Sequence, residues 1–123
     1  MTDPRHDRGI AAEQAVATWL TAHDWRIEAS RQREATGELD LVAVDPERWL
    51  VAIEVRLRWT ARTGDPLASV RPKHLRRVRS ALVEYSRRSA IPHRGLRVDL
   101  VAVGPGPRPG TWRLTRTPAV DAW

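Results

Sequence analysis

The fold is decided by residues 38–58, ELDLVAVDPERWLVAIEVRLR, in which two apolar runs flank a short polar linker. Apolar and polar residues alternate in residues 38–42 and again in residues 50–58, with the two-residue period of a half-buried strand. The linker, residues 45–49, contains Asp45 and Pro46, which favour a turn. The stretch therefore predicts a β-hairpin.

The alternation also predicts how the two strands pair. If Val44 lies opposite Leu50, one face of the hairpin carries only apolar pairs: Leu39–Val55, Leu41–Ile53 and Ala43–Val51. The other face then carries the charged pairs: Asp40–Glu54 and Glu38–Arg56. A shift of one residue would spread the carboxylates over both faces, so we predict this register.

Two carboxylates that lie directly opposite each other repel. The pair Asp40 and Glu54 therefore needs a compensating positive charge, and the candidates are a bound divalent cation and the neighbouring Arg56. Hard cations such as Mg²⁺ prefer carboxylate oxygens. The alternative is a solvated polar face on which Glu38 and Arg56 form a surface ion pair.

Composition narrows the class of protein. The length of 123 residues predicts one domain, at residues 9–123, after a flexible N-terminal arm at residues 1–8. The net charge of +6 favours polyanionic partners such as nucleic acid. Since Lys73 is the only lysine, this charge comes almost entirely from arginine, and it could equally reflect the base composition of the genome.

Several classes of site are excluded or disfavoured. The chain has no cysteine, so it has neither disulfides nor thiolate metal ligands. The four histidines do not have the spacing of zinc ligands. Because no apolar run is long enough to span a membrane and the N-terminus lacks a signal-peptide core, we expect a cytoplasmic protein without membrane contact.

Residues 9–23 predict a helix that packs on the sheet. Its apolar stripe consists of Ala12, Val16, Trp19 and Leu20. Glu13 lies three residues before Val16 and therefore on this buried stripe. A glutamate there is either a first-turn residue favoured by the helix dipole or a functional group facing the sheet.

The remaining elements complete a mixed α/β sheet flanked by helices. We predict strands at residues 25–30, 95–103 and 111–116, a turn at 31–36, a loop at 59–69 and a second helix at 71–88. In that helix Leu75, Val78, Leu82 and Tyr85 face inward. The other faces carry basic residues that either contact phosphates or are simply solvated: Arg71, Lys73, Arg76, Arg77 and Arg79.

Five short motifs follow one another over residues 9–103: Gly9-Ile-Ala-Ala-Glu13, Gly37-Glu-Leu-Asp40-Leu-Val, Ile53-Glu54-Val-Arg56-Leu-Arg58, Ser69-Val-Arg-Pro-Lys73 and Arg97-Val-Asp99-Leu-Val. In order and spacing they resemble the YraN-type family of small bacterial proteins. That family is similar to the restriction-endonuclease-like PD-(D/E)xK nucleases and to Holliday-junction resolvases. The resemblance implies their core of elements in the order α-β-β-β-α-β.

The resemblance also implies a site. Asp40 and Glu54 match the ligands of Mg²⁺ or Mn²⁺, with the carbonyl of Val55 completing the inner shell, and Glu13 matches an acid that reaches the metal or a water. Lys73 matches a lysine that we assign to phosphate contact. With it we predict three further contacts to nucleic acid: Arg58, Arg76 and Arg77. Resolvase-like proteins often act as symmetric dimers, although nothing in this chain marks a dimer surface.

Arg56 departs from the family pattern, which has Glu-x-Lys at this place. A lysine can help to activate water, whereas an arginine stays protonated and cannot serve as a base. It can still neutralise charge that develops on phosphate. Three hypotheses follow: a metal-dependent DNA endonuclease that acts on branched or single-stranded DNA, a nuclease-fold protein that binds nucleic acid without cutting it, and an accessory protein that binds another protein.

Overall fold

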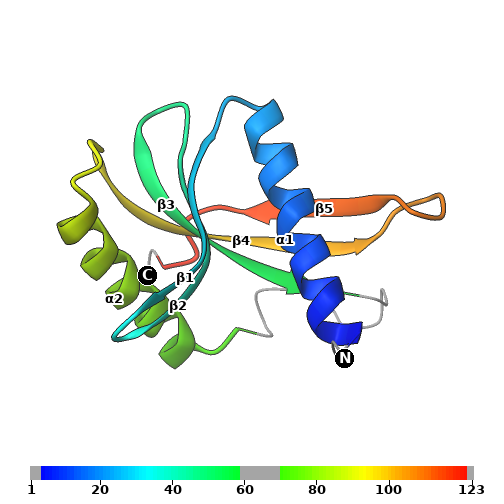
Figure 1. Ribbon diagram of the computed structural model, residues 1–123, viewed down its shortest axis with the longest axis horizontal. Coiled ribbons are helices and arrows are strands. Elements are labelled where there is room, and N and C mark those ends of the chain that lie inside the picture. Colours follow the sequence, from blue (N-terminus) through cyan, green and yellow to red (C-terminus); the bar gives the residue numbers. More distant parts are fainter. Residues whose placement is uncertain (1–3, 59–69, 122–123) are drawn as a thin grey trace.

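The computed structural model describes residues 4–58 and 70–121. Two helices and five strands follow one another in the predicted order (Figure 1): α1 (Pro4–Ala22), β1 (Arg26–Glu34), β2 (Gly37–Val44), β3 (Trp49–Leu57), α2 (Pro72–Ser89), β4 (Gly95–Pro105) and β5 (Trp112–Thr117). The loop predicted at residues 59–69 lies outside the described residues. The α/β class is confirmed.

The strands form one mixed sheet in the order β1-β2-β3-β4-β5. β3 and β4 are parallel, and every other neighbouring pair is antiparallel. A parallel pair needs a long crossover connection, and α2 lies within it. β5 pairs only with β4 and therefore lies at an edge of the sheet.

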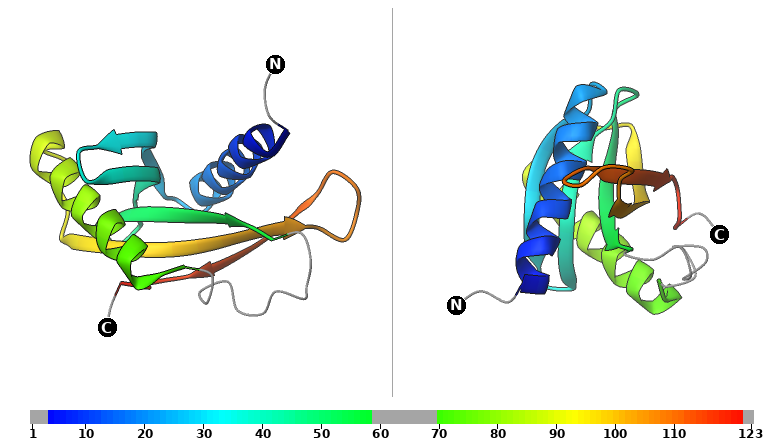
Figure 2. Two further views of the ribbon diagram at one scale, coloured as in Figure 1. Left: turned by 90° about the horizontal axis from the view of Figure 1, so that it is seen from below. Right: turned by 90° about the vertical axis from the view of Figure 1, so that its right-hand side faces the viewer.

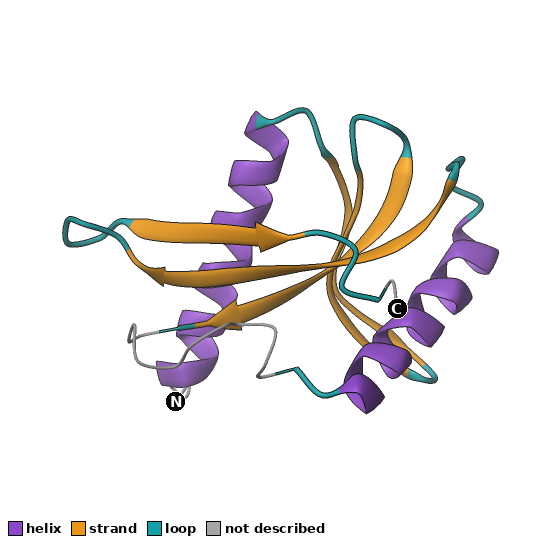
Figure 3. Cartoon of the chain, turned by 180° about the vertical axis from the view of Figure 1, so that it is seen from behind, coloured by secondary structure: helices purple, strands orange, loops and turns teal. Residues whose placement is uncertain are grey.

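The two helices cover opposite faces of the sheet (Figure 2, Figure 3). On the α1 side, alternate strand residues are buried: Leu41, Ala43, Val51 and Ile53. On the α2 side the residues between them are buried as well: Val42, Val44, Leu50 and Ala52. The predicted polar face is therefore wrong for this half of the hairpin, because each face has a helix to pack against.

The predicted register is confirmed where β2 and β3 pair. Leu41 lies opposite Ile53, Ala43 opposite Val51 and Val44 opposite Leu50. The pairs predicted beyond Leu41 are not formed, because β2 continues there with β1 alone and Leu39 packs on the α2 side. Glu38 accordingly lies opposite Arg33, whose Nη2 is 3.4 Å from Glu38 Oε2, and not opposite Arg56.

Two element ends differ from the prediction. α1 begins at Pro4, so the helix includes residues 4–8, which we had assigned to the N-terminal arm; proline is tolerated in a first turn, and Asp7 is favoured there by the helix dipole. β1 continues through the expected turn to Glu34, because its polar residues pair with β2 at the sheet edge. Neither helix is apolar over a length that could cross a membrane, as far as the described residues go.

Candidate carboxylate site

Asp40 lies where β2 and β3 stop pairing. Its Oδ2 accepts a hydrogen bond of 2.9 Å from the backbone N–H of Val55. The carboxylate thus replaces the backbone acceptor that Val55 lacks at this point of the ladder. On the other side of Asp40, Arg31 of β1 has the left-handed φ of 49°, which is uncommon for a residue with a side chain. The backbone is thus irregular on both sides of Asp40, at Val55 and at Arg31, and its carboxylate is accommodated within the sheet at this irregularity.

Glu54 is held by two donors from different elements. Its Oε1 lies 3.0 Å from Arg56 Nη2 on the same strand and 2.8 Å from His74 Nε2 in the first turn of α2. The Glu54 side chain is only 6% exposed. Arg56 therefore supplies a compensating positive charge to Glu54. It is one of the two candidates that the sequence analysis gave for this charge, the other being a bound divalent cation.

Glu13 faces the sheet from α1, as its position on the apolar stripe predicts. Its side chain is 15% exposed, and its Oε2 lies 3.6 Å from Arg31 Nη1. Burial raises the pKa of Glu13, Arg31 lowers it, and the negative charges of Glu38 and Glu54 raise it further. Glu13 thus belongs to the same electrostatic neighbourhood as the strand carboxylates.

The electrostatics of Asp40 connect it with the other two carboxylates. Burial raises the pKa of Asp40 from 3.8 to about 7, and the charges of Glu54 and Glu13 add to the rise. The Val55 hydrogen bond and Arg56 act in the opposite direction without reversing it. Carboxylates from α1, β2 and β3 therefore share a site whose negative charge is only partly compensated.

Such a site suits a divalent cation. In the described parts of the chain no three His, Asp or Glu side chains are gathered as a ready metal cage. Mg²⁺ does not need one, since it commonly binds through one or two carboxylates and keeps several waters. Asp40 and Glu54 are the residues that would hold it, and Arg56 would then move from Glu54 towards a phosphate. The Val55 carbonyl stays a predicted ligand.

The predicted nucleic-acid contacts fall into two places. Lys73, Arg76 and Arg77 are exposed on α2, and with Thr36 and Ser80 they line a shallow hollow beside the β1–β2 turn. Arg58 lies apart from this group, at the end of β3, where its backbone N–H donates to the carbonyl of Val103 over 2.7 Å. The structure thus brings three of the four residues together.

His74 is the site residue that the sequence analysis missed. We had examined the histidines only for zinc-ligand spacing, and His74 lies 20 positions from Glu54. Its contact arises because Pro72 starts α2 and places His74 in the first turn, over the sheet. The sequence signal for His74 was its position directly after Lys73, the last residue of a motif already assigned to the site.

The raised pKa of Asp40 predicts a pH-dependent stability. The folded protein holds this proton more tightly than the unfolded chain does, so the free energy of unfolding falls as pH rises from 3.8 to about 7. We expect Asp40→Asn, which keeps an acceptor for Val55, to be more stable than wild type by about 1–2 kcal/mol at pH 8, but equally stable at pH 4. Urea unfolding at both pH values measures this. Glu47→Gln, at an exposed carboxylate, is the control, and an Asp40→Asn difference that did not change with pH would contradict the prediction.

The comparisons with known proteins agree on one group. The family model described as uncharacterised protein family UPF0102 matches residues 12–103. A UPF0102 protein of Maricaulis maris is 40% identical over 116 residues, which cover 94% of this chain and 89% of that protein. A UPF0102 protein of Sphingopyxis alaskensis is 36% identical over 98 residues, or 80% of this chain and 82% of the relative.

Proposed function

The chain belongs to the uncharacterised protein family UPF0102, and from its carboxylate site we propose that it is a metal-dependent DNA endonuclease. The family assignment confirms the resemblance to the YraN-type family. The observation that carries the activity is the buried Asp40 carboxylate, whose pKa is raised to about 7 by burial first and then by the charges of Glu54 and Glu13. Perturbed carboxylates at a break in a sheet are typical of functional sites.

The residues divide the reaction among them. When bound to Asp40 and Glu54, Mg²⁺ or Mn²⁺ would polarise the scissile phosphate and lower the pKa of a water. Glu13 faces the same site from α1, where its carboxylate can orient the attacking water. Arg56, once released from Glu54, can neutralise the charge that develops on the phosphate. The exposed Lys73, Arg76 and Arg77 would bind phosphates to one side of the one that is cut.

Cleavage assays test this function through Arg56. We expect wild type to cut labelled single-stranded, duplex or four-way-junction DNA with Mg²⁺ or Mn²⁺, and Arg56→Lys to cut about tenfold faster or more, since lysine is more easily tuned as a partner of the attacking water. Arg79→Lys makes the same exchange at an arginine whose partner is Asp121, and it should not change the rate. If neither wild type nor Arg56→Lys cuts any substrate, the proposal of an active nuclease is wrong.

A second candidate is a nuclease-fold protein that binds nucleic acid without cutting it. The ion pair between Arg56 and Glu54 favours this reading, because it gives Glu54 a positive partner without any metal. It predicts DNA binding that weakens with salt and does not change when EDTA replaces Mg²⁺.

A further inference from the structure

Part of the positive charge on the arginines of this protein is neutralised by acids. Within residues 4–58 and 70–121, the arginines that form ion pairs include Arg26, Arg31, Arg33, Arg56, Arg79, Arg88, Arg97 and Arg116. Exposed arginines without an acidic partner in those ranges include Arg76 and Arg77, in the hollow beside the β1–β2 turn. They also include Arg108 and Arg113, which lie on the β4–β5 hairpin. Since uncompensated charge is what attracts a polyanion, the hairpin is a second place to look for a contact.

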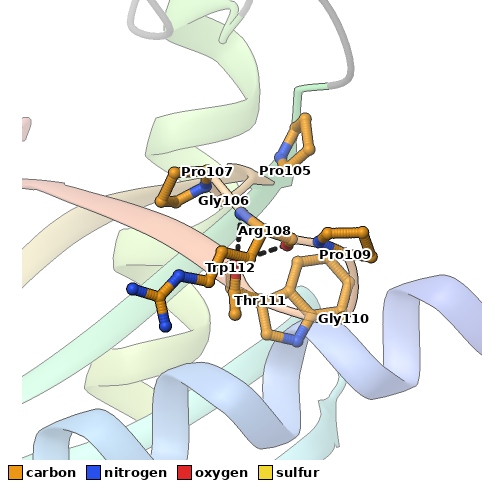
Figure 4. Close-up of a pocket in the computed structure, with 8 residues that line it drawn as sticks. All are labelled: Pro105, Gly106, Pro107, Arg108, Pro109, Gly110, Thr111 and Trp112. Atoms are coloured by element: carbon orange, nitrogen blue, oxygen red, sulfur yellow. Dashed lines mark hydrogen bonds between the residues drawn. The ribbon is translucent and has the colours of Figure 1, made fainter.

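The end of this hairpin has a fixed shape. We define the hairpin tip as residues 105–112, which join β4 to β5 (Figure 4). The N–H of Gly106 donates to the carbonyl of Thr111 over 2.8 Å, and the hydroxyl of Thr111 donates to the carbonyl of Arg108 over 2.6 Å. Three prolines, at 105, 107 and 109, restrict the backbone further. A Cβ at residue 106 would lie 2.2 Å from Thr111 Oγ1, so the tip requires glycine there. The position of Arg108 is therefore set before any partner binds.

The tip is also purely basic. Residues 100–120 contain no aspartate or glutamate, and Arg116, the third arginine of the segment, is already paired with Asp99. Arg108 and Arg113 thus add two uncompensated charges to a hairpin that extends beyond the ends of the other strands (Figure 1, Figure 3). The exposed side chain of Arg108 extends away from the turn (Figure 4).

The hairpin tip and Glu54 lie along the direction of the same two paired strands, β3 and β4. Glu54 lies opposite Leu100 in the parallel β3–β4 pair. Pro105 is five residues further along β4, which corresponds to about 16 Å at the usual rise of a strand. Duplex DNA advances about 3.4 Å per base pair, so this distance spans roughly five base pairs.

We propose that the β4–β5 hairpin binds the phosphate backbone of duplex DNA about five base pairs from the bond at the carboxylate site, through Arg108 in the hairpin tip and Arg113 directly after it. This inference rests on the proposed function, because it assumes that DNA occupies that site. It adds a requirement for the substrate: a duplex flank on the tip side. Because the backbone of the hairpin tip is already fixed, the tip loses little conformational freedom on binding, which favours such a contact.

The test is the salt dependence of binding to a duplex of about 24 base pairs, measured by fluorescence anisotropy in EDTA with three variants. In Arg108→Ala/Arg113→Ala two phosphate contacts are lost, and the slope of log K against log salt should fall by about 1.8. Its loss of affinity should therefore be roughly tenfold greater at 50 mM than at 200 mM salt. Arg108→Lys/Arg113→Lys keeps the charges and should keep the slope. Arg87→Ala removes one exposed arginine near the far end of α2 and should leave the slope unchanged.

The outcomes separate the two proposals. If wild type binds the duplex but the double alanine variant has the same slope, the tip does not contact phosphate and only this inference is overturned. If the Arg87→Ala variant changes the slope as much as the double alanine variant does, the loss is one of general charge and the inference is overturned as well. If wild type binds no DNA at 50 mM salt, the proposed function itself fails.

Discussion

Asp40→Asn should reduce the rate of metal-dependent DNA cleavage by at least about 100-fold while the protein stays folded. Loss of a group that only supports a metal ligand typically costs 10–100-fold, so loss of a carboxylate ligand should cost at least as much. The fold should persist because asparagine keeps an oxygen that can accept the Val55 N–H bond. Initial cleavage rates with Mg²⁺ and with Mn²⁺ provide the measurement.

Metal-dependent stabilisation separates a lost ligand from a general defect. At a Mg²⁺ concentration of about 100 times its dissociation constant, wild type should gain about 2.7 kcal/mol, and Asp40→Asn should gain almost nothing. Glu47→Gln, at an exposed carboxylate in the β2–β3 turn, should retain both the cleavage and the gain. Asp40→Asn that cut DNA at the wild-type rate would show that the carboxylate site is not the active site.

Asp99→Ala should lower the free energy of unfolding by about 3–5 kcal/mol, the largest stability loss that we expect from a single substitution in this protein. Asp99 is fully buried on β4. Its two oxygens accept hydrogen bonds from Arg97 Nε at 2.8 Å, from Arg116 Nη1 at 2.8 Å and from the Ala119 N–H at 2.9 Å. Removing the carboxylate would leave these three donors without their buried acceptor.

Urea unfolding of Asp99→Ala measures this loss. Glu28→Ala, which breaks the more exposed ion pair with Arg26, is the matched control and should cost less than about 1 kcal/mol. If Asp99→Ala does not fold, Arg116→Met removes one donor and keeps the carboxylate, and it should cost about 1 kcal/mol. If Asp99→Ala and Glu28→Ala lost the same free energy of unfolding, the burial of Asp99 would not increase its contribution to stability, and the prediction would be contradicted.

The alternation in residues 38–58 was sufficient to predict the central hairpin and most of its register. It could not reveal that the sheet has a helix on each face. The face predicted to be polar therefore also includes Val42 and Ala52, which are buried against α2. Nor could it show where β2 leaves β3, since that depends on the pairing of Glu38 with Arg33 across the β1–β2 turn.

The candidate site was predictable to the extent that its residues follow local patterns. Helical spacing alone placed Glu13 on the sheet side, whereas strand parity placed Asp40 directly opposite Glu54, a pair that β2 and β3 do not form. The contact of His74 with Glu54 and the network around Asp99 were not predictable in this way. Both depend on elements distant in sequence: the first turn of α2 over β3, and the meeting of β4, β5 and the segment at Ala119.

The hydrogen bond from Val55 to Asp40 gives the site its own spectroscopic probe. The amide proton of Val55 is hydrogen-bonded to the side-chain carboxylate of Asp40 and not to a backbone carbonyl of a neighbouring strand. Its NMR chemical shift therefore depends on whether Asp40 carries a proton, a negative charge or a coordinated cation. Its neighbour Ile53 is held in the regular β2–β3 ladder and serves as an internal reference. A titration followed at these two backbone amides can therefore report the state of the site without substrate and without any substitution.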